Sequence, residues 1–361
     1  MKQIPDSVFH DLATAYLVNG KYTDGFPHAA LNIIRKHKLF KLFLPESLGG
    51  LGMSLEDTLN VIQRCAYING SLGWLLQIGN GGNYFAAFVD GKTSRELFAS
   101  ENAVLAGSGA LTGTATPVEG GYTVSGLWKY ASGSAYASFF TFSAKVEGSD
   151  RTISGCLMPE QVNVIDDWKT IGMRFTTTNS FTAENQFVPE KFVFNLNELK
   201  SHAEIPVFSF PFLAYAQAFF LSVQYGLLSR ILHEASVAIT KNEERWKILH
   251  AERASTARSS VFFGMQMCVN FHAELKQLVN DIGTTAGTDR DVLVTKLDAA
   301  AKNQNSEMLT QAKTVFSLLG MEVLYEEHPI NIAYRDMIVC GQHSLLNVHG
   351  FNITSTISPV S

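Results

Sequence analysis

The spacing of apolar residues changes twice along the chain, and these two changes limit the folds that it can adopt. Residues 5 to about 100 place apolar side chains at intervals of three and four, which is typical of amphipathic helices. From about 103 to 195 the interval falls to two, and glycine and proline separate the runs, which predicts about six to eight strands. Helical spacing returns at residue 206. This order excludes a Rossmann fold, which alternates strands with helices.

After the strands, four long helical segments are expected, roughly at 206–240, 250–283, 290–320 and 331–347. Long helices with short connections are typical of a four-helix bundle. We therefore predict an α+β fold that is mostly α, with a helical domain at 1–102, a β-domain at 103–200 and a four-helix bundle at 201–361. A hairpin is expected around Gly120 and Gly121, and Ser54 is expected to cap a helix.

The charge balance and the cysteines indicate the setting in which the chain works. The 361 residues include 28 Lys and Arg against 33 Asp and Glu, a net charge of −5, and no basic cluster occurs. Nucleic-acid binding needs clustered positive charge, so we expect no such partner. The cysteines are far apart and form no CxxC pair, which argues against zinc or a disulfide framework: Cys65, Cys156, Cys268 and Cys340. The N-terminal segment lacks the features of a secretory signal, and we expect a cytoplasmic protein.

The most apolar stretch, residues 206–228, is long enough to span a bilayer. Gln217 and Gln224 lie inside it, and Arg230 and His233 follow directly. Polar residues at these places favour a helix that is buried on most sides in the protein, and we expect no membrane association.

Several common catalytic motifs are absent from the sequence. No GxSxG nucleophile elbow occurs, and the glycine-rich run at 79–83 is not followed by the Lys-Ser/Thr of a phosphate-binding loop. His343 and His349 are six residues apart, so they do not share a helix face as a metal-binding pair. We therefore expect no metal site.

Residues 124–140 are the first of three segments in which a site is plausible. A strand carrying Trp128 and Tyr130 runs into Ser132 and Gly133. One interpretation is a strand that buries aromatic side chains and ends in a turn. The other is that backbone N–H groups and the Ser132 hydroxyl face a planar heteroaromatic ligand. The residues alone leave both interpretations open.

The second segment, residues 166–192, combines an aromatic face at Trp168 with a close backbone approach at Gly172 and hydroxyls at 176–178. In the third, residues 318–343, Gly320 is expected to close a helix. Arg335 and His343, eight residues apart, would then lie within about 80° of each other on the next helix. A helical histidine is more often structural than catalytic, so its role stays open here.

Together these segments resemble the acyl-CoA dehydrogenase superfamily of flavoproteins over residues 40–345. Four motifs occur in the family's order: LFLPESLGGLGM, GLWKYASG, DDWKTIGMR followed by FVPE, and LGMEVLYEEHPINIAYRD. The resemblance implies an N-terminal helical domain, a central β-barrel domain and a C-terminal four-helix bundle. It also implies a bound flavin, either FAD or FMN, and a homodimer or homotetramer.

The resemblance further implies which residues meet the flavin. It places Ser132 near flavin N5, and it assigns cofactor binding to a set of nine residues: Ser108, Trp128, Ser132, Gly133, Trp168, Arg174, Thr176, Gly320 and Arg335. The segment around Arg335 commonly binds flavin across a dimer interface in this family.

The branch of the family is indicated by the residue at the position of the catalytic base. Acyl-CoA dehydrogenases carry a glutamate nine residues after the motif arginine, where this chain has Ser344. His343 precedes it and resembles the histidine of reduced-flavin monooxygenases such as dibenzothiophene monooxygenase and aromatic hydroxylases. In that branch the histidine deprotonates a substrate or stabilises a flavin C4a-(hydro)peroxide. His343 and Ser132 are therefore the predicted catalytic residues.

The same resemblance implies a separate flavin reductase and a hydrophobic or aromatic substrate, held by residues such as Trp74, Phe85 and Phe212. Two departures from the family pattern stand out. Asn80 and Asn83 lie where these monooxygenases often carry a second histidine, and Met321 replaces a glycine.

Two other functions remain open from the sequence. One is an acyl-CoA dehydrogenase whose base has moved to another helix, for example to Glu234. The other is a binding protein that kept the flavin fold and lost turnover.

Overall fold

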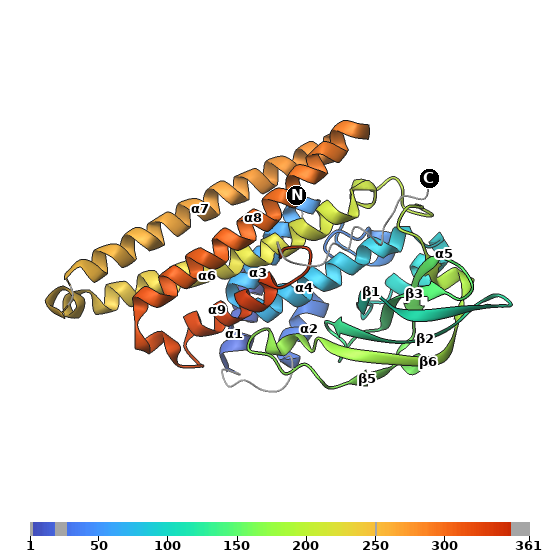
Figure 1. Cartoon of the computed structure of the whole chain (residues 1–361), viewed down its shortest axis with the longest axis horizontal. Coiled ribbons are helices and arrows are strands. Elements are labelled where there is room, and N and C mark those ends of the chain that lie inside the picture. Colours follow the sequence, from blue (N-terminus) through green and yellow to red (C-terminus); the bar gives the residue numbers. More distant parts are fainter. Residues whose placement is uncertain (1–2, 19–26, 250, 348–361) are drawn as a thin grey trace.

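The computed structural model describes residues 3–18, 27–249 and 251–347, which form an elongated molecule with long helices at one end and a β-sheet at the other (Figure 1). The order of elements is helices, then strands, then helices, as the hydrophobic spacing predicted. His349, which the sequence analysis considered as a metal ligand, lies outside the described residues.

In the described part of the chain, five α-helices precede the strands: α1 (Asp6–Val18), α2 (His28–Lys36), α3 (Leu55–Ile68), α4 (Gly70–Gly82) and α5 (Gly91–Phe98). Ser54 caps α3 as predicted, because its Oγ accepts a hydrogen bond of 3.1 Å from the Asp57 N–H. Asn69 has an extended backbone and accepts from the Leu72 N–H at 3.1 Å. Asn69 therefore ends α3 and caps α4, so that the helical run after Ser54 becomes two helices.

The described residues then form seven strands: β1 (Leu105–Val118), β2 (Gly121–Ala131), β3 (Phe139–Val146), β4 (Thr152–Leu157), β5 (Asn163–Ile165), β6 (Asn179–Pro189) and β7 (Val193–Phe194). Their order in the sheet is β5-β6-β2-β1-β3-β4-β7, and only β1 and β3 pair in parallel within the described residues. Val118 pairs with Gly121, which confirms the predicted hairpin. Among the described strands no hydrogen-bonded pair joins the two edges β5 and β7, so the sheet is open where a barrel was predicted.

Trp128 lies in the core of this sheet. Its ring stacks on Phe181 at 5.1 Å, and its Nε1 donates to the Ser143 carbonyl at 2.9 Å. Space for the indole exists because its neighbours Gly113 and Gly126 face each other across β1 and β2 without side chains. The indole is fully buried and its N–H is satisfied. The structure therefore does not support the predicted contact between Trp128 and a cofactor, because protein atoms already surround the side chain.

Among residues 195–249 and 251–347, four α-helices follow the sheet: α6 (Phe212–Leu249), α7 (Ala251–Thr284), α8 (Gly287–Leu319) and α9 (Pro329–Gly341). The predicted first helix began at 206, but Pro206–Ser209 is a 3-10 turn. The predicted last helix extended to 347, but α9 ends at Gly341, so His343 lies in the turn beyond the helix. The domain boundaries near 102 and 200 stay predictions.

The N-terminal helices pack directly against the C-terminal ones. A Cβ atom at Gly226 of α6 would lie 2.3 Å from the carbonyl oxygen of Gln63 in α3. The missing side chain at Gly226 therefore allows the two backbones to approach closely. Figure 1 shows α3 and α4 beside the long α6.

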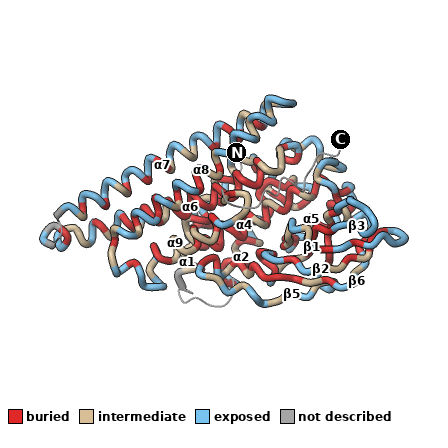
Figure 2. The backbone as a smooth tube through the Cα atoms, in the orientation of Figure 1, coloured by how far each residue is buried: buried red, intermediate tan, exposed pale blue. Residues whose placement is uncertain are grey.

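Helix α6 forms the centre of this helical body. By length and composition alone its segment Phe212–Trp246 is apolar enough to cross a membrane, but 83% of the tested window is buried inside the molecule. Figure 2 shows α6 mostly in the colour of buried residues. The Nε2 atoms of Gln217 and Gln224 donate to Asp298 and Asn305, each at 2.6 Å. The segment therefore serves as a core helix, as predicted.

Candidate active site

Ser132 lies in the turn that ends β2. Tyr130 and Gly133 both have left-handed backbones, with φ of 70° and 80°, and this conformation stops the strand. The Gly133 N–H then donates to the Thr176 carbonyl at 2.8 Å. This bond holds the turn against the segment that contains the three threonines predicted as a source of hydroxyl groups.

A chain of hydrogen bonds starts at Trp74 of α4 and passes through Ser132. The Trp74 Nε1–H donates to Ser132 Oγ at 2.9 Å, and Ser132 Oγ lies 2.8 Å from Thr178 Oγ1. Thr178 Oγ1 lies 2.6 Å from Thr176 Oγ1, which in turn lies 2.7 Å from the Met173 carbonyl oxygen. All three hydroxyl groups are buried.

The carbonyl at the end of this chain fixes the direction of every bond in it. A carbonyl oxygen only accepts hydrogen bonds, so the Thr176 hydroxyl donates its hydrogen to the Met173 carbonyl oxygen. Thr178 must then donate to Thr176, and Ser132 must donate to Thr178. Since Ser132 also accepts from Trp74, its Oγ keeps one lone pair and no hydrogen. Any further group that meets Ser132 Oγ must therefore be a hydrogen-bond donor.

His343 lies beside the same tryptophan. Its ring centroid is 4.0 Å from that of Phe220 in α6 and 5.9 Å from that of Trp74. His343 Nδ1 accepts a hydrogen bond from the Leu345 N–H at 3.3 Å, so the neutral imidazole carries its proton on Nε2. Burial among the aromatic rings lowers the pKa of His343 to about 4. The imidazole is therefore neutral at physiological pH.

Trp74 thus connects the two predicted catalytic residues. Its indole N–H binds Ser132 from β2, and its ring lies next to His343 beyond α9. Helix α6 completes the arrangement with Phe220, whose ring lies 5.3 Å from Trp74. Four segments that are distant in the sequence therefore meet at this point. The chemical roles of the two residues stay proposals.

Asp336 holds the threonine segment against α9, and sequence reasoning did not identify this role. Its carboxylate accepts a 2.5 Å hydrogen bond from the Met173 N–H and another from the Gly70 N–H at the start of α4. Burial raises the pKa of Asp336 to about 6, although these bonds and the nearby Arg335 act in the opposite direction. The sequence signal that could have indicated this role is the position of Asp336 directly after Arg335 in the fourth motif.

Three of the residues assigned to cofactor binding instead clamp the loop before β6. Trp168 Nε1 donates to the Met173 carbonyl at 2.8 Å, and Arg174 Nε donates to the Thr170 carbonyl at 3.0 Å. Arg335 donates to the Ile171 carbonyl at 3.1 Å. These bonds shape the loop that carries Thr176, so their direct contact with a cofactor stays a prediction.

Ser108 and Gly320 lie outside the hydrogen-bonded chain. Ser108 occupies an irregular stretch of β1, between the shifted pairs at Gly107 and Leu111. Gly320 follows α8 with φ of 83°, and a Cβ atom there would lie 2.5 Å from Arg253. The atoms nearest that Cβ position belong to Arg253 and not to the hydrogen-bonded chain, so cofactor binding by Ser108 and Gly320 stays a prediction.

The two asparagines at the place of the missing histidine are structural. Asn80 Oδ1 accepts from the Leu42 N–H at 2.8 Å, and its Nδ2 donates to the carbonyls of Leu39 and Leu76. Asn83 Nδ2 donates to the Phe40 carbonyl at 2.6 Å. These bonds occupy both N–H donors of Asn80 and one of the two N–H donors of Asn83, and neither side chain supplies the proton-transfer group of a histidine.

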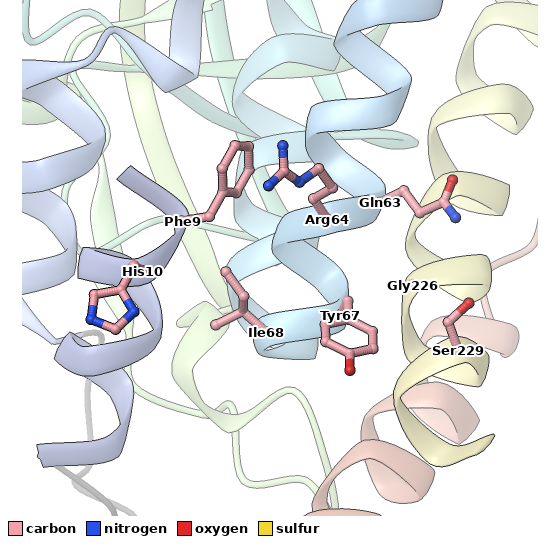
Figure 3. A pocket seen from close by; sticks show the side chains of 8 residues that line it. All are labelled: Phe9, His10, Gln63, Arg64, Tyr67, Ile68, Gly226 and Ser229. Carbon is pink, nitrogen blue, oxygen red and sulfur yellow. The ribbon is translucent and has the colours of Figure 1, made fainter. Parts of the chain in front are cut away.

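The other aromatic residues predicted to line a substrate pocket, Phe85 and Phe212, lie 5.9 Å apart. Phe85 also stacks on Phe194 at 5.1 Å. A separate pocket of about 430 Å³ opens between α1, α3 and α6, and Figure 3 shows its lining. The residues that line it include none of the predicted site residues: Phe9, His10, Gln63, Arg64, Tyr67, Ile68, Gly226 and Ser229.

The helical, β-sheet and helical parts, with the site at their meeting point, define an acyl-CoA dehydrogenase-like fold. No protein-family model matches the chain. The chain is 27% identical to a pigment production hydroxylase of Rhodococcus sp. over 326 residues, which cover 84% of this chain and 82% of the relative. Further relatives are described as oxygenase subunits or components of flavin-dependent monooxygenases.

Solved structures agree with these relatives. XiaF from Streptomyces sp., in complex with FADH2 and glycerol, superposes with a TM-score of 0.80 at 21% identity, covering 95% of this chain and 90% of XiaF. TdsC from Paenibacillus sp. A11-2, in complex with FMN and indole, gives a TM-score of 0.75 at 17% identity, with 92% and 91% covered. The predicted resemblance to the acyl-CoA dehydrogenase superfamily, and to its reduced-flavin monooxygenases, is confirmed.

Proposed function

We propose that the chain is the oxygenase component of a two-component flavin-dependent monooxygenase that hydroxylates an apolar aromatic small molecule. A separate reductase supplies the reduced flavin. One observation carries this proposal, namely that Trp74 joins an acceptor-only serine, Ser132, to a neutral histidine, His343. The names of the relatives, which are hydroxylases and flavin-dependent monooxygenases, support it.

The polar groups of the site fit a reduced flavin. The resemblance places Ser132 beside flavin N5, which carries a hydrogen in the reduced cofactor and only accepts hydrogen bonds in the oxidised one. Ser132 Oγ has a lone pair and no hydrogen to offer, so it suits the reduced form. Thr177 Oγ1 is buried and has no partner among the described residues, so a further polar group is available in the adjacent turn. When bound, the reduced flavin supplies the electrons that activate dioxygen.

His343 contributes a hydrogen-bond donor. Its Nδ1 is occupied by the Leu345 N–H, so Nε2 holds the proton of the neutral ring. A pKa of about 4 makes His343 a weak base. Of the two roles implied by the family, donation of a hydrogen bond from Nε2 to a reacting oxygen is therefore favoured over removal of a substrate proton.

The aromatic neighbours of His343 shield part of its ring, which is half-buried. Phe220 and Trp74 pack against its ring from α6 and α4. Hydrogen bonds are stronger where water is excluded, and competing hydrolysis and proton leakage are suppressed. An aromatic substrate also gains free energy by packing against such rings.

Nothing in the described structure favours a displaced dehydrogenase base. Glu234 forms an ion pair of 2.7 Å with Arg230, one turn earlier on α6. It lies about four turns of helix, or ~20 Å, beyond Phe220, whose ring contacts His343. The position of Ser344 supplies no carboxylate either.

The finer predictions are retained as part of this proposal. They are a homodimer or homotetramer, a cytoplasmic location, and the use of FAD or FMN. The solved neighbours hold FADH2 in one case and FMN in the other, which supports a flavin without choosing between the two.

A stopped-flow experiment tests the proposal. The purified chain is loaded with reduced flavin without oxygen and then mixed with oxygenated buffer, while the flavin absorbance is recorded. We expect a transient species that precedes oxidised flavin and that is lost in His343→Ala. Immediate reoxidation, together with bleaching of oxidised flavin by an acyl-CoA, would instead identify a dehydrogenase. If neither redox form of flavin binds, both catalytic functions are wrong.

A further inference from the structure

Asp336 of α9 is a buried carboxylate that binds two other segments of the molecule. It is 4% exposed, and it accepts a 2.5 Å hydrogen bond from the Met173 N–H and another from the Gly70 N–H. Met173 lies in the loop before β6, and Gly70 is the first residue of α4. Burying an ionised carboxylate costs free energy, so its position between three segments requires an explanation.

The backbone leaves room for Asp336 on two sides. A Cβ atom at Gly70 would lie 2.6 Å from both the Cβ and the Oδ2 of Asp336. A Cβ atom at Gly172 would lie 2.7 Å from the backbone nitrogen of Asp336 and 2.4 Å from the carbonyl oxygen of Arg335. Both glycines therefore allow α4 and the loop to approach α9 closely enough for one short carboxylate to reach both N–H groups.

Each segment at this carboxylate leads to a residue of the candidate site. Gly70 lies one turn before Trp74, so its hydrogen bond holds the end of α4 from which Trp74 projects. The carbonyl of Met173 is the group at which the hydroxyl chain from Ser132 ends. Helix α9 itself ends two residues before His343. The three segments that carry Trp74, the hydroxyl chain and His343 are therefore held together at one point.

We infer that Asp336 is a positioning residue of the proposed monooxygenase: its ionised carboxylate holds α4 and the loop before β6 against α9, and so sets how Trp74 and the hydroxyl chain meet the flavin. This inference rests on the proposed function and adds a residue through which that site is regulated by pH. Protein atoms surround Asp336, so it acts through Gly70 and Met173 and not on a reacting atom.

The two hydrogen bonds depend on the ionisation of Asp336. An ionised carboxylate offers two strong acceptor oxygens, whereas in the protonated group one oxygen carries a hydrogen and accepts more weakly. Burial raises the pKa of Asp336 to about 6, although the bonds from Met173 and Gly70 act in the opposite direction. Protonation as the pH falls through about 6 therefore weakens the contact with α4 or with the loop.

The charged and titratable groups that act on Asp336 keep their charge state in this pH range. Arg335 on the same helix and Arg174 in the loop lower the pKa of Asp336, and arginine side chains stay protonated in proteins. Burial raises the pKa values of Tyr16 in α1 and Cys340 in α9, so both groups stay neutral. A change between pH 7.5 and pH 5 at this contact therefore reports on Asp336.

Hydrogen exchange of the flavin-free, full-length chain tests the inference at the two N–H groups. Asp336→Asn replaces the carboxylate by a neutral group of the same shape with one acceptor. At pH 7.5 we expect the peptides that cover residues 70–76 and 172–178 to exchange about tenfold faster in the variant, the equivalent of one hydrogen bond. After correction for the intrinsic effect of pH on exchange, the wild type should approach the variant at pH 5.

Flavin affinity distinguishes positioning from a purely structural role. Oxidised riboflavin is a suitable probe, because it contains the isoalloxazine ring and has no group that titrates between pH 5 and pH 7.5. Its dissociation constant is measured by fluorescence. We expect the constant of the wild type to rise about tenfold as the pH falls over this range. Asp336→Asn should bind with the weaker constant at both pH values.

Gln311→Ala serves as the matched control. The Gln311 amide is buried, and its Nε2 donates to the Ser260 carbonyl at 2.7 Å, between α8 and α7. The variant loses a buried hydrogen bond that involves neither α4 nor the loop before β6. It should therefore keep the exchange rates of both peptides and the pH dependence of riboflavin binding.

Three results would overturn the inference. One is exchange that changes in neither peptide, or in only one of them, in Asp336→Asn. Another is a riboflavin affinity of the wild type that does not depend on pH. The third is an equal loss of affinity in Gln311→Ala, which would show that stability alone controls binding. The exchange measurement needs no flavin, whereas the stopped-flow experiment with His343→Ala tests the proposed function, so the two failures are distinguishable.

Discussion

Trp74 Nε1 donates a 2.9 Å hydrogen bond to Ser132 Oγ and so links an N-terminal helix to the end of a β-strand. This bond occupies one of the two lone pairs of Ser132 Oγ. The hydroxyl hydrogen of Ser132 is donated to Thr178 Oγ1. The protein thereby determines in advance what kind of group Ser132 can meet. Reduced and oxidised flavin differ in this respect at N5, which makes the arrangement testable.

Thr178→Val should reduce the preference of the protein for reduced over oxidised flavin. Without the Thr178 hydroxyl, Ser132 regains a free hydrogen and can donate it to N5 of the oxidised cofactor. We expect the ratio of the two dissociation constants to change by about tenfold, the equivalent of one hydrogen bond. Anaerobic titrations with both redox forms measure this ratio. Thr178→Ser keeps the chain and should behave as the wild type; an unchanged ratio in Thr178→Val would show that the direction of the chain is irrelevant.

His343→Phe should remove part of the acid sensitivity of the fold. The pKa of His343 is about 4 in the folded chain and 6.5 without burial, so the unfolded state binds more protons between these values. The stabilising contribution is therefore complete above pH 6.5 and is lost as the pH falls towards 4. The free energy of unfolding, measured by denaturant titration, should lose about 3 kcal/mol more in the wild type than in the variant over this range. Parallel curves would contradict a lowered pKa of His343 in the folded chain.

Asp336 changes the pH dependence of the unfolding free energy in the opposite direction to His343. The two contributions therefore have to be separated when this free energy is measured against pH. Its folded pKa of about 6 lies above the ordinary 3.8, so the folded state binds more protons. Its contribution is complete below pH 3.8 and is lost as the pH rises through 6. Because the group is present in both proteins, it cancels in the comparison of wild type with His343→Phe.

Asp336→Ala should destabilise the fold at pH 7 despite this unfavourable ionisation. The substitution leaves the buried N–H groups of Met173 and Gly70 without an acceptor. We expect a loss of about 2–6 kcal/mol, since each of the two unsatisfied donors costs about 1–3 kcal/mol. Asp336→Asn keeps one acceptor and should lose less. Thermal unfolding of the three proteins checks the order, and equal midpoints for Ala and wild type would contradict it.

Gly113→Ala should destabilise the sheet, whereas Gly109→Ala on the same strand should not. A Cβ atom at Gly113 would lie 2.3 Å from the Trp128 ring, but one at Gly109 would meet nothing within 4 Å. Overpacking of this kind costs about 1–3 kcal/mol. Denaturant midpoints of both variants provide the measurement. Similar midpoints would mean that the indole of Trp128 moves freely in the core.

Local patterns predicted the elements of this fold better than they predicted its contacts. The change in period located the strands, and Ser54 and the hairpin at Gly121 were correct because capping and tight turns depend on a few adjacent residues. The predicted last helix extended to residue 347, whereas α9 ends at Gly341. The prediction was too long because apolar residues continue after Gly341 although the chain turns there.

Side-chain direction explains most of the errors in the site. Trp128 occurs in a motif near Ser132, but it points into the sheet because Gly113 and Gly126 leave room for it. Asn80 lies where related monooxygenases often carry a second histidine, but three backbone groups use its amide. The hydrogen-bond partners of the Asn80 amide include Leu39 and Leu42, which are far away in the sequence. The spacing of residues around Asn80 therefore does not reveal that its amide is occupied.

The close approach of α3 and α6 at Gly226 has a consequence for how this protein can be engineered. Helix α4, which follows α3 directly, carries Trp74, while α6 carries Phe220, so the contact between α3 and α6 also sets the distance between these two sides of the site. Exchanging the N-terminal helices with those of a relative would place a foreign surface against Gly226. A chimera that is intended to change the choice of substrate must therefore take α3 and the turn of α6 around Gly226 from the same parent protein.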